Sequence, residues 1–498
     1  MDGQGVSWKA QTLGEVLERQ ARERGGAEAL VTSTHRFSYK ELFQRAKTCA
    51  GAMQALGLGR GDHVGILMGN DENWLALFYG AALIGAVTVP VNTRFKSAEI
   101  DFCVKQADCK TLFYVERFLK NDYGSMVSGL DLQKINVVER MPEGSLKPVE
   151  VSAQDVLLIQ FTSGTTAYPK GAMLTHDNML RDAWAAGLRV GIRPEDRYFN
   201  CRPFFHVAGS TLSALMALTA GACLVTLPTF EAGAALELME RERCTLISGN
   251  DTIFQMLMGH EDFAKRRLSL RGGWAAAGPQ TMRRIIDVLG ARQICAAYGL
   301  SEASPNVVMS DWRDDENLRI DGLALPHEGV QLRISAEGEI QVRGWNVMRG
   351  YYNNPEANAK AFTADGWLRT GDLGELTADG RLRMSGRLKD VFRVGGENVA
   401  PAEVEEVLLA HPAVETAQVI GVPDARLGEV PCAYVTLKSG VSVFPQDLID
   451  WCKGKSANFR VPRYVRIVED FEVIGMTASG KVQKQKLREH ALRELKLG

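Results

Sequence analysis

The sequence predicts an α/β protein. We expect a large N-terminal domain of layered α/β subdomains with a small antiparallel β region, followed by a small α+β C-terminal domain. Three observations lead to this prediction. The 498 residues are 45% hydrophobic, which is enough to bury more than one core. In the first half, short apolar runs alternate with helical patterns, as is typical of parallel α/β units. After residue 329 the pattern changes to short alternating strands, and it changes again after residue 390.

The first elements are two helices, each marked by a capping box in front of an amphipathic pattern. Thr12 with Glu15 begins one helix, and Ser38 with Glu41 begins the other. Apolar runs at residues 64–68, 87–91, 112–115 and 156–159 then predict strands, with helical segments between them. Residues 140–154 resemble a simple connecting loop. This order indicates a layered α/β body.

The last third of the chain has a different sequence pattern, typical of short antiparallel strands. Residues 331–334 and 339–342 alternate as strands do, and Asp379-Gly380 is a strong hairpin signal, so this region is expected to be antiparallel. After GRLKD (386–390) we expect a helix at 401–409, strands at 414–422 and 431–437, and a helix at 445–452. We therefore expect an N-terminal domain of residues 1–387 and a C-terminal domain of residues 388–498.

Charge and cysteine usage exclude several classes of protein. The 58 basic and 60 acidic side chains nearly cancel, and no run of like charge marks a nucleic-acid or lipid-headgroup patch. Nine scattered cysteines without a C-x-x-C pair fit reduced thiols in the cytoplasm, not disulfides or zinc. The N-terminus lacks the pattern of a secretion signal. Residues 74–91 and 207–230 are uncharged, but Gly and Pro interrupt them, so each is predicted to be a buried helix running into a buried strand, with no transmembrane segment.

The stretch FTSGTTAYPKG (161–171) follows the apolar run 156–159 and suits a polyphosphate. Small hydroxyl and glycine residues let the backbone approach a ligand closely, and Lys170 adds a positive charge. It is not a Walker loop, because Pro169 precedes the lysine and Gly171 follows it. A polar surface turn is the alternative interpretation.

Three distant segments carry complementary chemistry. YGLSE (298–302), after the small-residue run AAAG (275–278), offers an aromatic ring for a purine, a hydroxyl for a phosphate and a carboxylate for Mg²⁺. In Thr370-Gly371-Asp372 a carboxylate can accept hydrogen bonds from ribose hydroxyls, with Arg387 as a nearby donor. TASGK (477–481) presents a second lysine. Each segment alone is more often a surface feature than a ligand site.

Together these segments resemble the motifs of the AMP-forming adenylating superfamily, which contains acyl-CoA synthetases, luciferases and the adenylation domains of peptide synthetases. The resemblance covers essentially the whole chain. The motifs occur in the family's order, as FTSGTTAYPKG, PFFHVAG (203–209), YGLSE, GWLRTGD (366–372), GRLKD, GGENVAPAEVE (395–405) and SGK (479–481). Two positions depart from the family pattern: Ala167 replaces a usual Gly, and Ser301 replaces a usual Thr while keeping its hydroxyl.

The resemblance implies that a carboxylate attacks the α-phosphate of ATP, that pyrophosphate leaves, and that the acyl group then passes from the acyl-adenylate to a thiol. It implies ATP, Mg²⁺ and coenzyme A as cofactors. The β- and γ-phosphates would be held by Thr162, Ser163, Gly164, Thr165, Thr166 and Lys170, and Mg²⁺ by Glu302 with Thr165. Tyr298 would stack on adenine and Ser301 would contact the α-phosphate. The nucleotide positions are completed by Ala277, Gly278, Ala297, Gly299, Asp372 and Arg387, the last two on the ribose.

The resemblance also assigns the catalytic groups and makes the C-terminal domain mobile. Lys481 would bridge the substrate carboxylate and the α-phosphate, and Glu302 and His206 complete the catalytic set. A hinge at Lys389 would then remove that lysine and turn the face with Arg393, Gly395 and Gly396 toward the site. Lys389 can equally be a solvated linker lysine, and His206 can be a hydrogen-bonded core residue.

The leading hypothesis is an AMP-forming acyl-CoA synthetase that acts on a small-molecule carboxylic acid in the cytoplasm. Delivery of the acyl group to a carrier protein or an amine is the alternative within the class, and a non-catalytic nucleotide-binding sensor is the alternative outside it. PFFHVAG lacks the aspartate that pairs with an amino acid substrate, and apolar Phe204, Val207 and Leu300 suit a medium-chain or aromatic acyl group. Asn250 and Asp251 either place polar groups near the acyl pocket or cap the next helix, which we favour. The sequence leaves a homo-oligomer open.

Overall fold

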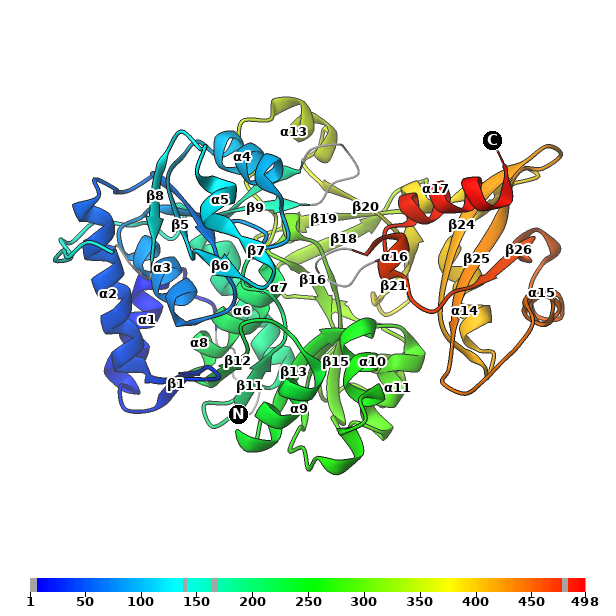
Figure 1. The fold of residues 1–498 in the computed structure, drawn as a ribbon, viewed down its shortest axis with the longest axis horizontal. Coiled ribbons are helices and arrows are strands. Elements are labelled where there is room, and N and C mark those ends of the chain that lie inside the picture. The colour runs from blue at the N-terminus through cyan, green and yellow to red at the C-terminus, as the bar shows by residue number, and fades with distance from the viewer. Residues whose placement is uncertain (1–6, 138–140, 163–168, 477–481, 498) are drawn as a thin grey trace. The chain divides into compact units, whose positions relative to one another are not determined.

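The computed structural model describes residues 7–137, 141–162, 169–476 and 482–497 (Figure 1). By its internal contacts the chain divides into two compact units. The first contains residues 1–331 and 342–368, and the second contains residues 332–341 and 369–498. The boundary at residues 387/388, which the change of sequence pattern predicts, stays a prediction; the internal contacts divide the chain after residue 368 and place residues 332–341 in the second unit.

Two sheets form the frame of the first unit. The nine-stranded sheet has the order β17-β16-β15-β14-β13-β11-β12-β1-β2, and the six-stranded sheet has the order β10-β9-β4-β3-β5-β8. The strands of the first sheet are β1 Glu28–Val31, β2 Arg36–Ser38, β11 Arg197–Asn200, β12 Cys223–Thr226, β13 Leu246–Asn250, β14 Gly272–Ala276, β15 Gln293–Gly299, β16 Asn306–Met309 and β17 Leu325–Pro326. Those of the second are β3 His63–Leu67, β4 Val87–Pro90, β5 Cys109–Tyr114, β8 Gln133–Asn136, β9 Val156–Thr162 and β10 Lys170–Thr175. Neighbours from β15 to β1 and from β9 to β8 run parallel, as the alternation of apolar runs with helices predicts.

Helices cover these sheets, and α6 (His176–Val190) contacts strands of both, so it lies between them (Figure 1). The other helices of this unit are α1 Leu13–Glu23, α2 Tyr39–Ala55, α3 Glu72–Leu83, α4 Ser97–Gln106, α5 Tyr123–Val127, α7 Val207–Gly209, the π-helix η1 Ser210–Leu215, α8 Met216–Ala220, α9 Ala232–Arg241, α10 Asp251–Gly259, η2 Phe263–Lys265, α11 Pro279–Asp287, η3 Ser301–Ala303, α12 Glu316–Ile320 and α13 Pro355–Ala361. A small hairpin joins β6 Arg117–Phe118 to β7 Asn121–Asp122.

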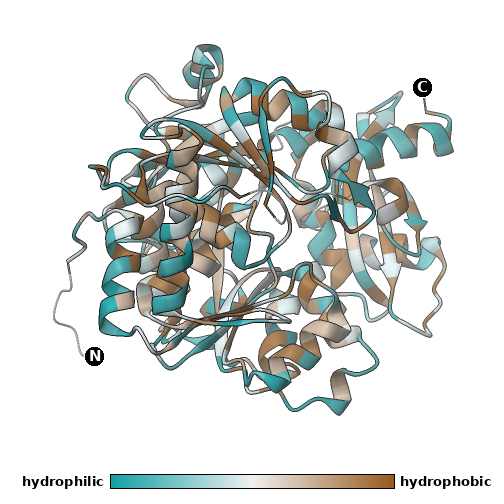
Figure 2. Ribbon diagram, turned by 60° about the vertical axis from the view of Figure 1, so that its left-hand side comes forward, coloured by the Kyte–Doolittle hydropathy of each residue, from teal (hydrophilic) through white to brown (hydrophobic). Residues whose placement is uncertain are grey.

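Local sequence signals account for several of these elements. Both predicted capping boxes are confirmed: Thr12 and Glu15 close the first turn of α1, and Ser38 and Glu41 close that of α2. The two uncharged stretches are buried helices that run into the buried strands β4 and β12, as predicted. Within the described residues, no helix has both the length and the apolar character needed to cross a bilayer. Hydrophobic segments occur on both strands and helices, and many other helical segments are hydrophilic (Figure 2).

The second unit contains most of a four-stranded sheet and all of a five-stranded one. The four-stranded sheet has the order β18-β19-β20-β21, with the elements β18 Val330–Ile334, β19 Glu339–Gly344, β20 Leu368–Leu376 and β21 Leu382–Arg387. As predicted, β20 and β21 are antiparallel around the turn at Gly380. The other sheet consists of β22 Phe392–Val394, β23 Glu397–Val399, β24 Val414–Asp424, β25 Gly428–Leu437 and β26 Tyr464–Ile467. The helices of the second unit are η4 Leu388–Asp390, α14 Pro401–Leu409, α15 Pro445–Lys453, η5 Asn458–Arg460, α16 Glu472–Gly475 and α17 Lys484–Leu495.

Candidate active site

Four neighbouring parallel strands of the first unit end at one edge of the nine-stranded sheet, and each is followed by a residue singled out from the sequence. In sheet order the strands are β15, β14, β13 and β11. Because they are parallel, their carboxyl ends share an edge, which is where open α/β sheets bind ligands. The residues gathered there are Ala297, Tyr298, Gly299, Ser301 and Glu302 at the end of β15, Ala277 and Gly278 after β14, Asn250 and Asp251 after β13, and His206 after β11.

The end of β15 requires glycine. A Cβ atom on Gly299 would lie 1.8 Å from the carbonyl oxygen of Pro305, so any other residue would push the backbone apart. This close approach lets β15 turn directly into the short helix η3, which begins at Ser301 and carries Glu302. The turn thus presents the hydroxyl and the carboxylate one after the other, next to the strand that holds Tyr298.

Asn250 and Asp251 have separate roles at the end of β13. The side chain of Asn250 accepts a hydrogen bond from the amide of Ile253 at 3.1 Å and so caps α10, which confirms the favoured interpretation. Asp251 Oδ1 accepts a hydrogen bond from the amide of Gly278 at 3.1 Å. Burial raises the pKa of Asp251. Asp251 therefore ties together two neighbouring loops of the candidate site, a link that the local sequence signal does not contain.

His206 is the N-cap of α7, where its Nδ1 accepts a hydrogen bond from the amide of Ala208 at 3.1 Å. The preceding residue, Phe205, accepts a hydrogen bond through its carbonyl from Gln160 Nε2 at 3.2 Å. Since Gln160 lies on β9, this contact ties the loop with His206 to the strand that leads into the predicted phosphate loop. The π-helix η1 follows at once, and π-turns inside helices are frequent near functional sites.

The predicted phosphate loop connects β9 to β10. Thr162 ends β9, Lys170 begins β10, and the two residues are paired in the ladder. Thr162 Oγ1 donates to the carbonyl of Lys170 at 3.4 Å. Ser163, Gly164, Thr165 and Thr166 lie outside the described residues. The antiparallel pair therefore fixes both ends of the loop.

Tyr351 connects Lys170 to Glu302, although nothing in the sequence singled it out. Its hydroxyl donates to Glu302 Oε1 at 2.8 Å, and the ammonium of Lys170 lies 5.2 Å from the centroid of its ring. Lys170, expected to bind phosphate, and Glu302, expected to bind the metal ion, thus both contact the side chain of Tyr351. Tyr351 is only 8% exposed. These contacts join residues that are far apart in the chain, so no local pattern predicts them. The only signal in the sequence is that Tyr351 lies in the stretch RGYYNNPEAN.

Among the described residues, no group of three or more His, Cys, Asp or Glu side chains could hold a metal ion by itself. Glu302 offers one carboxylate; the residue is half-buried, and its helix η3 contacts the strand that begins with Lys170. A single carboxylate fits Mg²⁺ that shares its remaining positions with phosphate oxygens and water.

Seven predicted positions belong to the second unit, six of them among the described residues, and two of these are paired. Asp372 on β20 faces Arg387 at the end of β21, with Arg387 Nε 3.3 Å from Asp372 Oδ1. Burial lowers the pKa of the Lys389 ammonium in η4, and the positive charge of Arg387 acts in the same direction. The pair places a hydrogen-bond acceptor, the carboxylate, beside a donor, the guanidinium.

The remaining positions form the hairpin of β22 and β23. Gly395 and Gly396 both have positive φ, 60° and 98°, which a two-residue turn of this kind needs. On the strand before it, Arg393 Nε donates to Asn398 Oδ1 at 3.1 Å. Lys481 lies outside the described residues, but a bridge between Met476 and Val482 pairs the residues that flank its segment.

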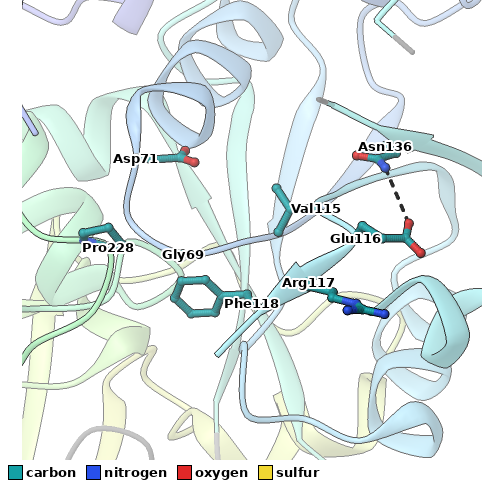
Figure 3. A pocket seen from close by; sticks show the side chains of 8 residues that line it. All are labelled: Gly69, Asp71, Val115, Glu116, Arg117, Phe118, Asn136 and Pro228. Atoms are coloured by element: carbon teal, nitrogen blue, oxygen red, sulfur yellow. Dashed lines mark hydrogen bonds between the residues drawn. The ribbon is translucent and has the colours of Figure 1, made fainter. Parts of the chain in front are cut away.

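The first unit also contains a cavity of about 360 Å³ that none of the predicted residues lines (Figure 3). Its wall consists of Gly69, Asp71, Val115, Glu116, Arg117, Phe118, Asn136 and Pro228. The polar groups there have structural partners: Asp71 caps α3, and Asn136 Nδ2 donates to Glu116 at 3.5 Å. Burial raises the pKa of Asp71 to about 6. We place the candidate chemistry at the sheet edge, where the charged groups converge.

Comparison with known proteins shows the family of the chain. The family described as AMP-binding enzyme matches residues 17–352, and the family described as AMP-binding enzyme C-terminal domain matches residues 403–481. An octahydro-indenyl-propanoyl:CoA ligase of Rhodococcus jostii (strain RHA1) is 35% identical, with 96% of this chain and 98% of that protein covered. The mitochondrial medium-chain acyl-CoA ligase of Danio rerio is 31% identical, with 98% and 90% covered. The crystal structure of the anthranilate CoA ligase AuaEII with anthranoyl-AMP has a TM-score of 0.90 at 25% identity, with 98% of each chain covered.

Proposed function

Because the chain belongs to the AMP-binding enzyme family, we propose that it is an AMP-forming carboxylate–CoA ligase. It activates an organic acid with ATP and transfers the acyl group to coenzyme A. The observation that carries this proposal is the convergence of Lys170 and Glu302 on Tyr351, next to both ends of the predicted phosphate loop.

The first half-reaction joins a carboxylate oxygen to the α-phosphorus of ATP, and the bond to pyrophosphate breaks. Two anions must approach each other, so the site has to neutralise charge and align the reacting atoms. Lys170 and the hydroxyls of Thr162 and the adjoining loop bind the β- and γ-phosphates. Lys481 contacts the carboxylate and the α-phosphate. In the second half-reaction the thiol sulfur bonds to the acyl carbon, and AMP leaves.

The other positions bind and orient the nucleotide. Tyr298 stacks on adenine, and the paired Asp372 and Arg387 hold the ribose hydroxyls. Glu302, with Thr165, would hold Mg²⁺, and the bound ion would neutralise phosphate charge. The relevant observation is that η3, which carries Glu302, contacts β10, which begins with Lys170, and that the Tyr351 hydroxyl donates to the Glu302 carboxylate.

The substrate we propose is a medium-chain or aromatic carboxylic acid. Phe204 and Val207 flank His206, and both are fully buried apolar residues. The relatives that support this choice are named for medium-chain, fused-ring and aromatic acids. We propose a cytoplasmic location, since the nine cysteines are free thiols.

A panel of carboxylic acids tests the function when each acid is incubated with the protein, ATP, Mg²⁺ and coenzyme A. We expect AMP, pyrophosphate and acyl-CoA in equal amounts with the preferred acid, and no turnover when the acid is left out. Pyrophosphate release with no CoA thioester would contradict coenzyme A as the acceptor and indicate a carrier protein or an amine. If no acid supports nucleotide turnover, the ligase assignment is wrong.

A further inference from the structure

The segment of residues 348–352 joins the two halves of the candidate phosphate site. Toward one side it pairs with β10: the amide of Arg349 donates to the carbonyl of Met173 at 3.0 Å, and that of Tyr352 donates to Gly171 at 2.8 Å. Toward the other side, the amide of Met348 donates to the carbonyl of Glu302 at 2.8 Å. The backbone of this segment therefore sets how far η3 lies from the strand that begins with Lys170.

Tyr351 sits in the middle of the segment, and its main chain is held firmly. Its amide donates to Asn358 Oδ1 at 2.6 Å, and Asn358 Nδ2 donates back to the Tyr351 carbonyl at 3.0 Å. Asn358 belongs to α13, so a helix outside the site fixes the tyrosine. The ring has little freedom to leave its position between Lys170 and Glu302.

The phenol works as a donor only while it keeps its proton. A tyrosine phenol keeps its proton at neutral pH, since its ordinary pKa is about 10. Donation to Oε1 fixes the rotation of the carboxylate and leaves Oε2 in a set direction. A carboxylate held by such an outer partner binds a metal ion more tightly than one that rotates. The face of the ring attracts the ammonium of Lys170 as well.

We propose that Tyr351 is a positioning residue, whose hydroxyl orients the Glu302 carboxylate toward Mg²⁺ and whose ring holds Lys170 toward the phosphates. The proposal rests on the function given above, in which Glu302 serves Mg²⁺ and Lys170 serves ATP. It adds a residue that acts through both of them without touching the reacting atoms.

Tyr351→Phe tests the hydroxyl, because it keeps the ring beside Lys170. The matched control is Tyr352→Phe, which removes the neighbouring hydroxyl, a donor to Asp108 Oδ2 at 2.9 Å. Mn²⁺ binding in the presence of a non-hydrolysable ATP analogue, followed by electron paramagnetic resonance, reports on the metal without turnover. We expect Tyr351→Phe to weaken Mn²⁺ binding about 10- to 100-fold. Tyr352→Phe should bind as wild type does.

The kinetics should shift in the same way. In Tyr351→Phe the Mg²⁺ concentration for half-maximal pyrophosphate release should rise by the same factor, and kcat should recover at saturating Mg²⁺. A residue that merely supports the fold would lower kcat at every Mg²⁺ concentration. Wild-type Mn²⁺ affinity in Tyr351→Phe, or an equal loss in Tyr352→Phe, would overturn the proposal.

Two further variants keep the test decisive. Asn358→Ala keeps the tyrosine but removes both hydrogen bonds that hold its main chain, so the hydroxyl is no longer fixed beside Glu302 and Mn²⁺ binding should weaken. This variant serves if Tyr351→Phe does not fold, and unchanged Mn²⁺ affinity in it would overturn the proposal. Glu302→Gln separates this proposal from the proposed function. If Glu302→Gln binds Mn²⁺ as wild type does, the metal role of Glu302 fails and that of Tyr351 with it, whereas the ligase activity of the panel assay would stand.

Discussion

At the scale of single residues, Lys170 carries the clearest expectation. Its ammonium lies over the ring of Tyr351 at the start of β10, directly after the predicted phosphate loop. Lys170→Met should lower kcat/KM for ATP in pyrophosphate release by about 10²–10³-fold, because a fixed charge that stabilises the transferring phosphates is lost. Lys105→Met is the control, since Lys105 pairs with Asp101 on an exposed helix. Equal rates for Lys170→Met and wild type would remove Lys170 from the site.

His176 makes stability depend on pH. It is fully buried at the start of α6, its Nδ1 accepts a hydrogen bond from the amide of Leu13 at 3.1 Å, and its Nε2 has no partner among the described residues. Burial lowers its pKa from 6.5 to about 4. Between pH 6.5 and pH 4, His176 is therefore protonated in the unfolded chain but neutral in the folded chain. The free energy of unfolding falls as the pH falls through this range.

Between pH 7 and pH 5 this single group should cost about 2 kcal/mol of unfolding free energy. Urea unfolding followed by tryptophan fluorescence at both pH values measures the loss. His176→Gln should lose less between the two pH values than wild type does. The variant should retain some pH dependence, because burial also lowers the pKa of His327, to about 3. Identical losses in the variant and wild type would contradict the assignment.

Residue types at the site follow from the sequence, but their partners do not. The need for hydroxyls, a lysine and a carboxylate follows from phosphate chemistry, and the motifs name Thr162, Lys170 and Glu302 directly. Tyr351 and the bond from Gly278 to Asp251 are different, because each depends on contacts between segments that are distant in the chain. No local pattern encodes which tyrosine of RGYYNNPEAN faces inward.

At the scale of elements, local signals predicted caps and strands well and spatial order poorly. Capping boxes and turns involve residues a few positions apart, so α1, α2 and the hairpin at Gly380 could be recognised. The position of β11 between β12 and β13 could not, since sheet order depends on packing among distant segments. The π-helix after His206 was also unpredicted, because its extra residue per turn leaves no periodic signal.

The start of α17 offers an element-level prediction. Lys484 Nζ bonds to Glu405 of α14 and to the carbonyl of Val419 on β24 at 3.0 Å, three residues after Lys481. Lys484→Met should slow adenylate formation by roughly 10- to 100-fold, because a small displacement of a catalytic group is costly. Thioester formation from supplied acyl-adenylate should change far less.

Stopped-flow detection of pyrophosphate, alongside a thioester assay, separates these two effects. Lys453→Met is the control, as Lys453 pairs with Asp450 on the surface of the same unit. If Lys484→Met slows both half-reactions equally, the bonds of Lys484 stabilise the second unit as a whole. They would then not serve to position the segment that carries Lys481.

At the scale of the whole molecule, the α/β class predicted from the sequence is confirmed, whereas the predicted domains 1–387 and 388–498 stay a prediction. Composition and alternating patterns are global properties, which is why they sufficed. The hinge at Lys389 remains a proposal of ours, since it describes a motion. Such a motion would let one chain assemble two successive sites, each with its own lysine or loop in place.

The most direct measurement follows the two half-reactions separately in wild type and Lys481→Ala, using a radiolabelled acid in single-turnover quench experiments. Without coenzyme A, wild type should accumulate about one acyl-adenylate per chain, and added coenzyme A should convert it to acyl-CoA and AMP. Lys481→Ala should form no acyl-adenylate from acid and ATP, yet still convert supplied acyl-adenylate to the thioester. Release of ADP and phosphate by wild type, or equal loss of both half-reactions in the variant, would contradict a two-step ligase with Lys481 in the first step.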